Sequence, residues 1–195
     1  MPFKFITQPL LSGLYEPEGL YLNSPCAGES RVLQFWGENP EFYGQFTYNG
    51  VLLKGHNGLD LAVRPGSPIS AVDGGRVTEI SVERGGYGLY LKVEHSWGES
   101  FYAHLGEVTV EAGQWVARGV PLALAGEGER GSIPHLHLSI RLKPFHRFDG
   151  WGGFTDPLPY LPATDIQLPT PEENDEHPIF LPPPVAVEKP GLRRA

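Results

Sequence analysis

Cysteine is almost absent from the sequence. Its 195 residues contain a single cysteine, Cys26, so no disulfide can form within the chain and nothing requires an oxidising compartment. A structural zinc site is disfavoured for the same reason, because such sites usually fill all four positions with protein ligands, frequently cysteine. Free cysteine is among the most buried residue types. We therefore expect Cys26 to be a buried apolar residue and not a protease nucleophile.

Positive charge and long apolar runs are also scarce. The chain has 15 Lys and Arg residues against 23 Asp and Glu residues, a formal net charge of −8, and no basic patch stands out. This balance argues against electrostatic capture of nucleic acid or of an anionic membrane surface. Residues 1–9 hold no apolar run of signal-peptide length, and no stretch is long enough to span a bilayer. We expect no nucleic-acid partner and no membrane span, and the localisation stays open.

Glycine and proline, in contrast, are abundant. The 25 glycines and 20 prolines favour many short strands joined by turns, and we predict a mainly β protein. The organisation we expect is an irregular N-terminal extension, a central domain and a C-terminal tail, over residues 1–32, 33–145 and 146–195. Half of the 20 prolines lie between Pro157 and Pro190. This predicts an extended, polyproline-like and partly disordered tail, with wrapping around the domain or docking on a partner as alternatives.

A short alternating segment late in the central domain carries two histidines. His135, His137 and Ser139 alternate with apolar residues over positions 133–140, a pattern typical of a strand with one polar and one apolar face. The two imidazoles then share a face, roughly 6 to 7 Å apart along the strand, and resemble half of a metal site. The other interpretation is two polar residues on a solvated face.

A second polar pair lies earlier in the chain. His56 and Asp60 are spaced so that both lie on one side of an extended segment or of a helix. Gly55, Gly58 and the β-leaning residues after Asp60 favour a loop that enters a strand. A catalytic zinc ion takes three protein ligands from His, Asp, Glu or Cys and leaves a fourth position for water. His56, Asp60 and one histidine of the later pair would meet that requirement.

Two further histidines lie in alternating segments. Alternation over residues 89–95 places His95 on the apolar face, where we expect a hydrogen-bonded structural histidine. Alternation over residues 100–105 predicts that His104 shares a face with Tyr102. The opposite face of that segment would carry Phe101, Ala103 and Leu105.

Three motifs now stand in order along the chain. They are His56-x-x-x-Asp60, then Phe101-Tyr102-Ala103-His104-Leu105, then Pro134-His135-Leu136-His137. Together they resemble the LytM/lysostaphin-type zinc metallopeptidases, the M23 family of cell-wall endopeptidases, over about residues 33–141. The resemblance implies an all-β fold with an antiparallel β-sheet core and a loop-walled groove over a zinc site.

The resemblance also implies roles for single residues. The Zn2+ ligands would be His56, Asp60 and His137. The two catalytic histidines outside the ligand set would be His104 and His135. One of these would take a proton from the zinc-bound water as general base, and the other would hydrogen-bond the developing oxyanion, without an assignment of which does which. For the tyrosine that assists the transition state in some relatives, the candidates are Tyr48 and Tyr102.

The function implied is a zinc metalloendopeptidase that hydrolyses peptide bonds in peptidoglycan, in cross-links or stem peptides, so that peptidoglycan peptides are the expected partner. One alternative is a noncatalytic LytM-like module that binds peptidoglycan or activates other hydrolases. Another is a β-rich virion or scaffold protein with a structural metal. An enzyme that acts at the cell wall fits poorly with the lack of a signal sequence in residues 1–9, and a virion component, a phage-type lysin or a non-classical export route would each resolve this.

Overall fold

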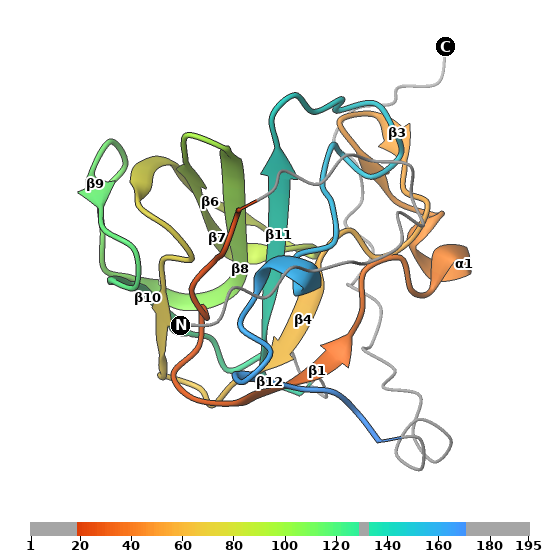
Figure 1. Ribbon diagram of the computed structural model, residues 1–195. Coiled ribbons are helices and arrows are strands. Elements are labelled where there is room, and N and C mark those ends of the chain that lie inside the picture. Colours follow the sequence, from red (N-terminus) through yellow and green to blue (C-terminus); the bar gives the residue numbers. More distant parts are fainter. Residues whose placement is uncertain (1–18, 129–132, 171–195) are drawn as a thin grey trace.

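The computed structural model describes residues 19–128 and 133–170 (Figure 1). Strands dominate the described chain. The elements are, in order, β1 (Ser30–Gln34), α1 (Pro40–Tyr43), β2 (Thr47–Tyr48), β3 (Val51–Leu52), β4 (Leu59–Ala62), β5 (Pro68–Ser70), β6 (Gly75–Glu83), β7 (Gly88–Glu94), β8 (Gly98–Val108), β9 (Trp115–Val116), β10 (Pro121–Ala125), β11 (His135–Leu142), η1 (Leu158–Tyr160) and β12 (Ile166–Gln167). The predicted all-β class is confirmed, because the two helical elements span only 4 and 3 residues.

One large sheet organises these elements. Its strand order is β12-β1-β4-β11-β8-β7-β6-β9, and β10 pairs with β5 and β8. The pairings are antiparallel except the one between β1 and β12, which is parallel. Strands β2 and β3 form a separate hairpin. Strand β11 therefore lies in the middle of the sheet between β4 and β8, as Figure 1 shows, with both of its edges paired.

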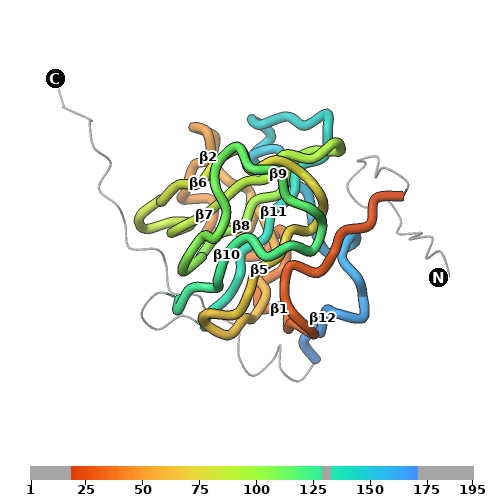
Figure 2. The backbone as a smooth tube through the Cα atoms, turned by 90° about the vertical axis from the view of Figure 1, so that its left-hand side faces the viewer, coloured from red at the N-terminus to blue at the C-terminus, as the bar shows by residue number. Residues whose placement is uncertain are grey.

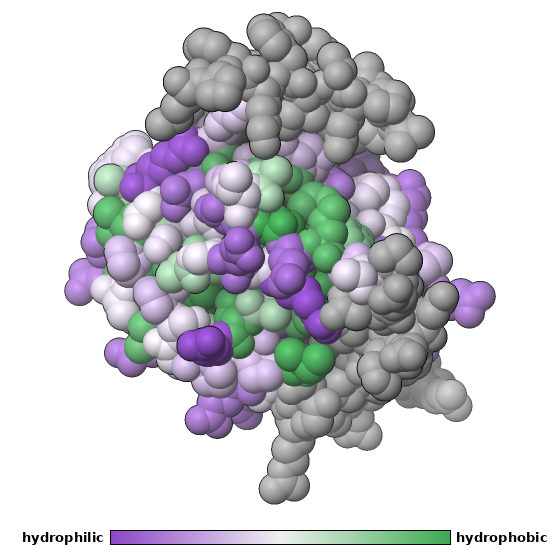
Figure 3. Space-filling view, turned by 60° about the horizontal axis from the view of Figure 1, so that its bottom comes forward, coloured by the Kyte–Doolittle hydropathy of each residue, from purple (hydrophilic) through white to green (hydrophobic). Residues whose placement is uncertain are grey.

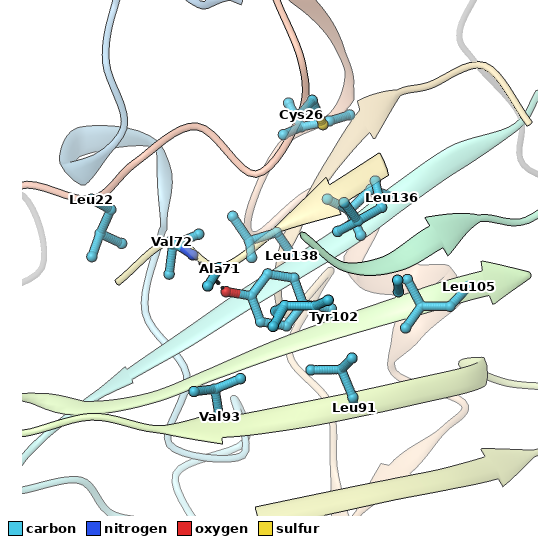
Figure 4. Packing of buried hydrophobic residues seen from close by; sticks show 14 of the residues in the cluster. Leu22, Cys26, Ala71, Val72, Leu91, Val93, Tyr102, Leu105, Leu136 and Leu138 are labelled. Carbon is cyan, nitrogen blue, oxygen red and sulfur yellow. Dashed lines mark hydrogen bonds between the residues drawn. The ribbon is translucent and has the colours of Figure 1, made fainter. Parts of the chain in front are cut away.

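The main hydrophobic core lies on one face of this sheet (Figure 4). Leu61, Leu91 and Leu138, from three different strands, are fully buried in it. Burial of one such side chain stabilises the fold by about 1.5 to 3 kcal/mol. Tyr102 places its ring in the same core, and its hydroxyl oxygen accepts a hydrogen bond of 2.9 Å from the backbone N–H of Val72. The core therefore accommodates this tyrosine without leaving its polar atom unpaired.

Two residues predicted to be structural are confirmed as such. Cys26 is buried at the edge of the main core, and burial raises the pKa of its thiol to about 11. His95 is also buried, with Nδ1 at 2.9 Å from the carbonyl oxygen of Gly74 and Nε2 at 2.7 Å from Oγ of Ser100. The raised pKa makes Cys26 a poor nucleophile, and both ring nitrogens of His95 are engaged in hydrogen bonds.

The opposite face of the sheet carries polar side chains around a smaller apolar cluster. Phe101 and Ala103 of β8 form this cluster with Phe154. In the strand register Ala103 lies opposite His137 and Phe101 lies opposite Ser139. Facing residues on neighbouring strands project to the same side, so the polar residues of β11 share this face with the small cluster.

The alternation predicted for residues 100–105 is wrong at His104. Tyr102 and Leu105 both lie in the main core, whereas Ala103 lies on the opposite face. The register between β7 and β8 shifts at this point, and His104 has a left-handed backbone with a φ of 60°. Regular alternation would have placed His104 in the core beside Tyr102. The bulge instead leaves it next to His135, with ring centroids 4.5 Å apart.

Segments from the first and the last parts of the described chain lie side by side (Figures 1 and 2). The backbone N–H of Leu22 donates a hydrogen bond of 2.9 Å to the carbonyl oxygen of Tyr160, and both residues are buried. The described parts of the expected extension and tail thus pack on the sheet. The division of the chain into residues 1–32, 33–145 and 146–195 remains a prediction. The expectations for residues 1–18 and for the proline-rich stretch beyond residue 170 lie outside the described residues.

Within residues 19–128 and 133–170, no helix combines the length and apolar character needed to cross a membrane. On the face drawn in Figure 3, green hydrophobic areas are separated by purple hydrophilic residues.

Candidate metal centre

Strand pairing brings the predicted site residues together. On β11, His137 lies opposite Asp60 of β4 on one side and opposite Ala103 of β8 on the other. His56 lies in the loop before β4, as the glycine-flanked motif predicts, and its backbone N–H donates a hydrogen bond of 2.8 Å to the carbonyl oxygen of Glu38. The rigid centre of the sheet therefore positions Asp60 and His137, while a short tethered loop positions His56.

Three potential ligand atoms converge at this point. His56 Nε2 lies 3.0 Å from His137 Nδ1. Asp60 Oδ1 lies 2.9 Å from His137 Nδ1 and 3.2 Å from His56 Nε2. All three residues are buried: His56 and Asp60 are each 1% exposed, and His137 is 3% exposed. They also form the group of His and acidic residues in the described chain whose spacing could hold a metal ion.

Hydrogen bonds on the far side of each imidazole determine which nitrogens carry protons. His56 Nδ1 lies 2.9 Å from the carbonyl oxygen of Phe35. A carbonyl can only accept, so Nδ1 carries the proton and Nε2 has the lone pair. Ser139 Oγ donates to the carbonyl oxygen of Asn57 at 2.9 Å, so it accepts from His137 Nε2 at 2.8 Å. His137 Nδ1 therefore also presents a lone pair.

Neutral imidazoles and an ionised Asp60 would point three acceptor atoms at one another, which is repulsive unless a positive charge lies among them. A proton on His56 is one solution; burial opposes it, but the Asp60 carboxylate raises the pKa of His56 on balance. A zinc ion is the other. Ligand atoms at tetrahedral zinc are separated by about 3.3 Å, close to the 2.9 and 3.2 Å found here. The donor set of two imidazoles and one carboxylate thus fits zinc in chemistry and spacing.

The two histidines predicted to be catalytic lie beside the donor atoms. The ring centroid of His104 is 4.5 Å from that of His135 and 6.3 Å from that of His137. His135 Nδ1 lies 2.8 Å from the carbonyl oxygen of Ile133, so this nitrogen carries the proton. His135 Nε2 is then an acceptor, 3.9 Å from Asp60 Oδ2. All five predicted residues therefore belong to one site, and their separate roles remain predictions.

Burial sets the protonation states of this site. Burial, together with the neighbouring His135 and His137, lowers the pKa of His104 to about 3. Burial also opposes the ionisation of Asp60, but the electrostatic influence of the adjacent His56 and His137 holds the pKa of that carboxyl well below its usual range. At neutral pH the site therefore contains a neutral His104 and an ionised Asp60.

Sequence reasoning missed three residues that shape the centre. Asn57 and Tyr87 are hydrogen-bonded, with Asn57 Nδ2 at 2.7 Å from the Tyr87 hydroxyl oxygen, and the Tyr87 ring lies 5.2 Å from the His137 ring. A Cβ at Gly58 would lie 2.6 Å from the His137 ring, so only glycine fits there. Asn57 and Gly58 lie inside the His56-x-x-x-Asp60 motif, and this position could have indicated that they belong to the site. Tyr87 follows a glycine turn, and no sequence pattern around it indicated a role in the site.

Of the two tyrosines predicted to assist the reaction, one lies on the other face of the sheet. Tyr102 is buried in the main core on the other face of the sheet, so its prediction is wrong. The Tyr48 hydroxyl accepts a hydrogen bond of 2.9 Å from Nη2 of Arg141, and its ring lies 6.4 Å from that of Tyr87. Tyr87, in contrast, contacts the metal centre directly, because its ring lies 5.2 Å from that of His137.

Comparison with known proteins assigns the central segment of the chain to a domain family. The model of Peptidase family M23 matches residues 54–148, which include His56, Asp60, His104, His135 and His137. Residues 54–148 form an M23 peptidase domain. The likeness to LytM/lysostaphin-type enzymes inferred from the three motifs is thereby confirmed.

Individual relatives support this assignment of the M23 domain. The peptidoglycan DD-endopeptidase ShyB of Vibrio cholerae is 40% identical over 90 residues, 45% of this chain and 21% of that protein. The DD-carboxypeptidase/endopeptidase Mpg of Neisseria meningitidis is 31% identical over 118 residues, 60% of this chain and 24% of that protein. A crystal structure titled as a zinc-containing peptidase from Vibrio cholerae shares the fold, with a TM-score of 0.52 and 27% identity over 76% of this chain and 41% of that one.

The similarity is restricted to part of each relative. The matched regions span between 19% and 40% of the length of the curated relatives. The chain therefore shares the M23 domain with these relatives, and not the rest of their length.

Proposed function

We propose that this chain is a zinc metalloendopeptidase that hydrolyses peptide bonds in bacterial peptidoglycan. The M23 domain and the peptidoglycan endopeptidases among its relatives support the reaction and the substrate class. The observation that carries the proposal is the convergence of His56 Nε2, Asp60 Oδ1 and His137 Nδ1 within 3.2 Å of one another. Their lone pairs face inward because the protons of both imidazoles are engaged on the far side.

His56, Asp60 and His137 would hold the zinc ion. A zinc ion bound there would supply a Lewis acid that activates water and polarises the scissile carbonyl group. Two neutral imidazoles and one carboxylate would leave the centre with a net charge of about +1, which preserves that acidity. Both imidazoles and the carboxylate are buried, and the low local dielectric strengthens their electrostatic interactions.

We assign the general base to His135. Its Nδ1 proton is engaged by the carbonyl oxygen of Ile133, so Nε2 is available to accept a proton from the attacking water. Nε2 also faces the side of Asp60 that does not contact His137, at 3.9 Å from Oδ2. His135 can therefore act beside the ligand set without belonging to it.

We assign stabilisation of the oxyanion to His104. With its pKa lowered to about 3, His104 stays neutral at physiological pH and offers an N–H group to the carbonyl oxygen as negative charge develops. A neutral donor needs no counter-ion. The bulge in β8 is essential to this assignment, because it brings His104 beside His135.

Digestion of purified peptidoglycans that differ in cross-link chemistry tests the proposed function. The zinc-loaded protein should release fragments with new peptide termini, detected by mass spectrometry, whereas protein stripped of metal should release none until zinc is restored. Stoichiometric zinc binding without cleavage of any wall type would contradict the proposal. That outcome would identify the chain as a noncatalytic module that binds peptidoglycan or activates other hydrolases.

A further inference from the structure

A cavity of about 440 Å³ has Tyr87 in its lining, and the Tyr87 ring lies 5.2 Å from the ring of His137 in the metal centre. It lies between the β2–β3 hairpin, which contributes Tyr48, and the β6–β7 hairpin, which contributes Glu83 and Tyr87. Phe101 forms part of its lining as well. No residue of the three predicted motifs except Phe101 takes part in it, so its chemistry is separate from that of the metal centre.

The register of the sheet joins this cavity to the metal centre. Glu79 of β6 lies opposite Lys92 of β7, Lys92 opposite Phe101 of β8, and Phe101 opposite Ser139 of β11. These residues form a row across four strands on the face that carries His137. The Phe101 ring lies 6.1 Å from the His137 ring. A peptide held at the metal centre would therefore reach this cavity with a neighbouring residue.

The cavity carries an excess of one negative charge. Lys92 Nζ lies 2.6 Å from Glu79 Oε2, and the Tyr90 hydroxyl donates to Glu79 Oε1 at 2.6 Å. The charge of Lys92 is thus matched by Glu79. Glu83 has no ion-pair partner among the residues that the structure describes. Two carboxylates and one ammonium group leave a net charge of −1 in the lining.

Aromatic rings complete the lining and suit a cation. Lys92 Nζ already lies 5.6 Å from the centroid of the Tyr90 ring and 5.9 Å from that of Phe101. Both distances are within the range of cation–π attraction. Tyr48 and Tyr87 offer further rings in the lining, 6.4 Å apart, and the Tyr48 ring already has the Arg141 guanidinium carbon 5.4 Å from its centroid. A second ammonium group could therefore contact aromatic faces and an unpaired carboxylate together.

We propose that this cavity binds a protonated primary amine of the peptide substrate, with Glu83 as its counter-ion and the tyrosine rings as its walls. The inference deepens the proposed function, because it identifies the class of peptide that the site selects. A side-chain amine of a diamino acid and an N-terminal amine share this chemistry. The site would bind a peptide with either amine free more tightly than the same peptide acetylated at that amine.

Equilibrium binding tests the inference independently of cleavage. Four versions of one short stem-type peptide, with the side-chain amine, the N-terminal amine, both or neither acetylated, are titrated into zinc-loaded His135→Ala protein by calorimetry. We expect one acetylation to weaken binding by about threefold to tenfold, as for a partly desolvated ammonium with one carboxylate and aromatic contacts. The version that shows the loss identifies which amine occupies the cavity. Equal affinity for all four versions would overturn the inference.

Two substitutions and a control assign the effect to the cavity. Glu83→Gln should reduce the ratio of affinities for free and acetylated peptide toward one, whereas Glu111→Gln, an exposed glutamate outside the cavity lining, should leave that ratio as it is. Lys92→Gln should increase the ratio, because it frees Glu79 to act as a second counter-ion. An increase cannot arise from partial unfolding. A ratio that is the same in all three variants would contradict the assignment to Glu83.

Cleavage of the same four peptides by the wild-type protein separates this inference from the proposed function. Cleavage of all versions at equal kcat/KM would uphold the peptidase and refute amine selection. Amine-dependent binding without any cleavage would uphold the cavity and refute the peptidase.

Discussion

The side chains of His137 and Ser139 lie on the same face of β11, and His137 Nε2 donates a hydrogen bond of 2.8 Å to Ser139 Oγ. The serine hydroxyl cannot donate in return, because its proton is directed at the carbonyl oxygen of Asn57. This relationship leaves the lone pair of His137 on Nδ1, the atom that faces Asp60 and His56. A serine that would not itself touch the metal thus prepares one of the three ligands.

Substitution Ser139→Ala should weaken zinc binding. Without the hydroxyl, the His137 ring loses the partner that fixes its tautomer and orientation, and we expect the affinity for zinc to fall by about tenfold to a hundredfold. Competition with a fluorescent zinc chelator measures this directly. Ser67→Ala, which removes a hydroxyl hydrogen bond in an exposed turn, is the matched control. A Ser139→Ala protein with wild-type affinity would show that the hydrogen bond has no role in ligation.

Substitution Gly58→Ala should damage the site by sterics alone. The added Cβ would lie 2.6 Å from the His137 ring and 2.7 Å from the carbonyl oxygen of Leu138. We expect a loss of about 1 to 3 kcal/mol in the free energy of unfolding, measured in urea without metal, and a reduced zinc content. Gly74→Ala adds the same methyl group where the nearest atom is 3.7 Å away, and should leave both quantities near the wild type. Equal behaviour of the two variants would refute the close approach at Gly58.

His104 combines a proposed catalytic role with a strained backbone. Its φ of 60° is unfavourable for any residue with a Cβ. His104→Gly should therefore be more stable than His104→Ala by about 1 kcal/mol in denaturant titrations, while both variants lose peptidase activity. Equal stability of these two variants would mean that the backbone at this position carries no strain.

The stability of the metal-free protein should depend on the protonation of His104. Its pKa is lowered from 6.5 to about 3 in the folded protein. Between these values the unfolded chain binds the proton and the folded protein does not, so the free energy of unfolding falls as the pH falls from 6.5 toward 3. One such group contributes a slope of up to about 1.4 kcal/mol per pH unit.

The His104→Ala variant isolates this contribution from that of the other titrating groups. Its free energy of unfolding, measured in urea at a series of pH values across the same interval, should fall less steeply than that of the wild type. Parallel curves for the two proteins would show that His104 does not hold a depressed pKa.

The residues at the centre of the site could be predicted from the sequence, because the spacing between them matches the two-residue period of a strand. His135 and His137 share one face of β11 as their alternation predicts, and Asp60 lies opposite His137 because the two strands pair in the expected antiparallel sense. His56 needed only the short glycine-flanked loop before β4. The apolar face of β7, with His95 at its end, was predictable for the same reason.

The remaining features depend on contacts that local patterns do not encode. The bulge at His104 breaks the period of two, and regular alternation therefore placed His104 on the face of Tyr102 and Leu105 on the opposite face, whereas Tyr102 and Leu105 share the main core. Tyr87 reaches the site because the turn between β6 and β7 lies beside His104, whose backbone N–H donates a hydrogen bond of 2.9 Å to the carbonyl oxygen of Tyr87. The cavity near Glu83 requires the β2–β3 hairpin opposite it, and the two segments are distant in the sequence. Such features follow from tertiary packing and become visible only in the folded chain.

Zinc content and peptide release, measured in the same samples of wild-type, His137→Ala and His135→Ala protein, test the central claim most directly. We predict that His137→Ala loses both the metal and the cleavage of peptidoglycan. His135→Ala should keep a full equivalent of zinc and lose cleavage by about a hundredfold or more, because it lacks only the general base. Equal loss of zinc in the two variants, or cleavage that persists in His135→Ala, would contradict the assignment of ligands and base on which this account depends.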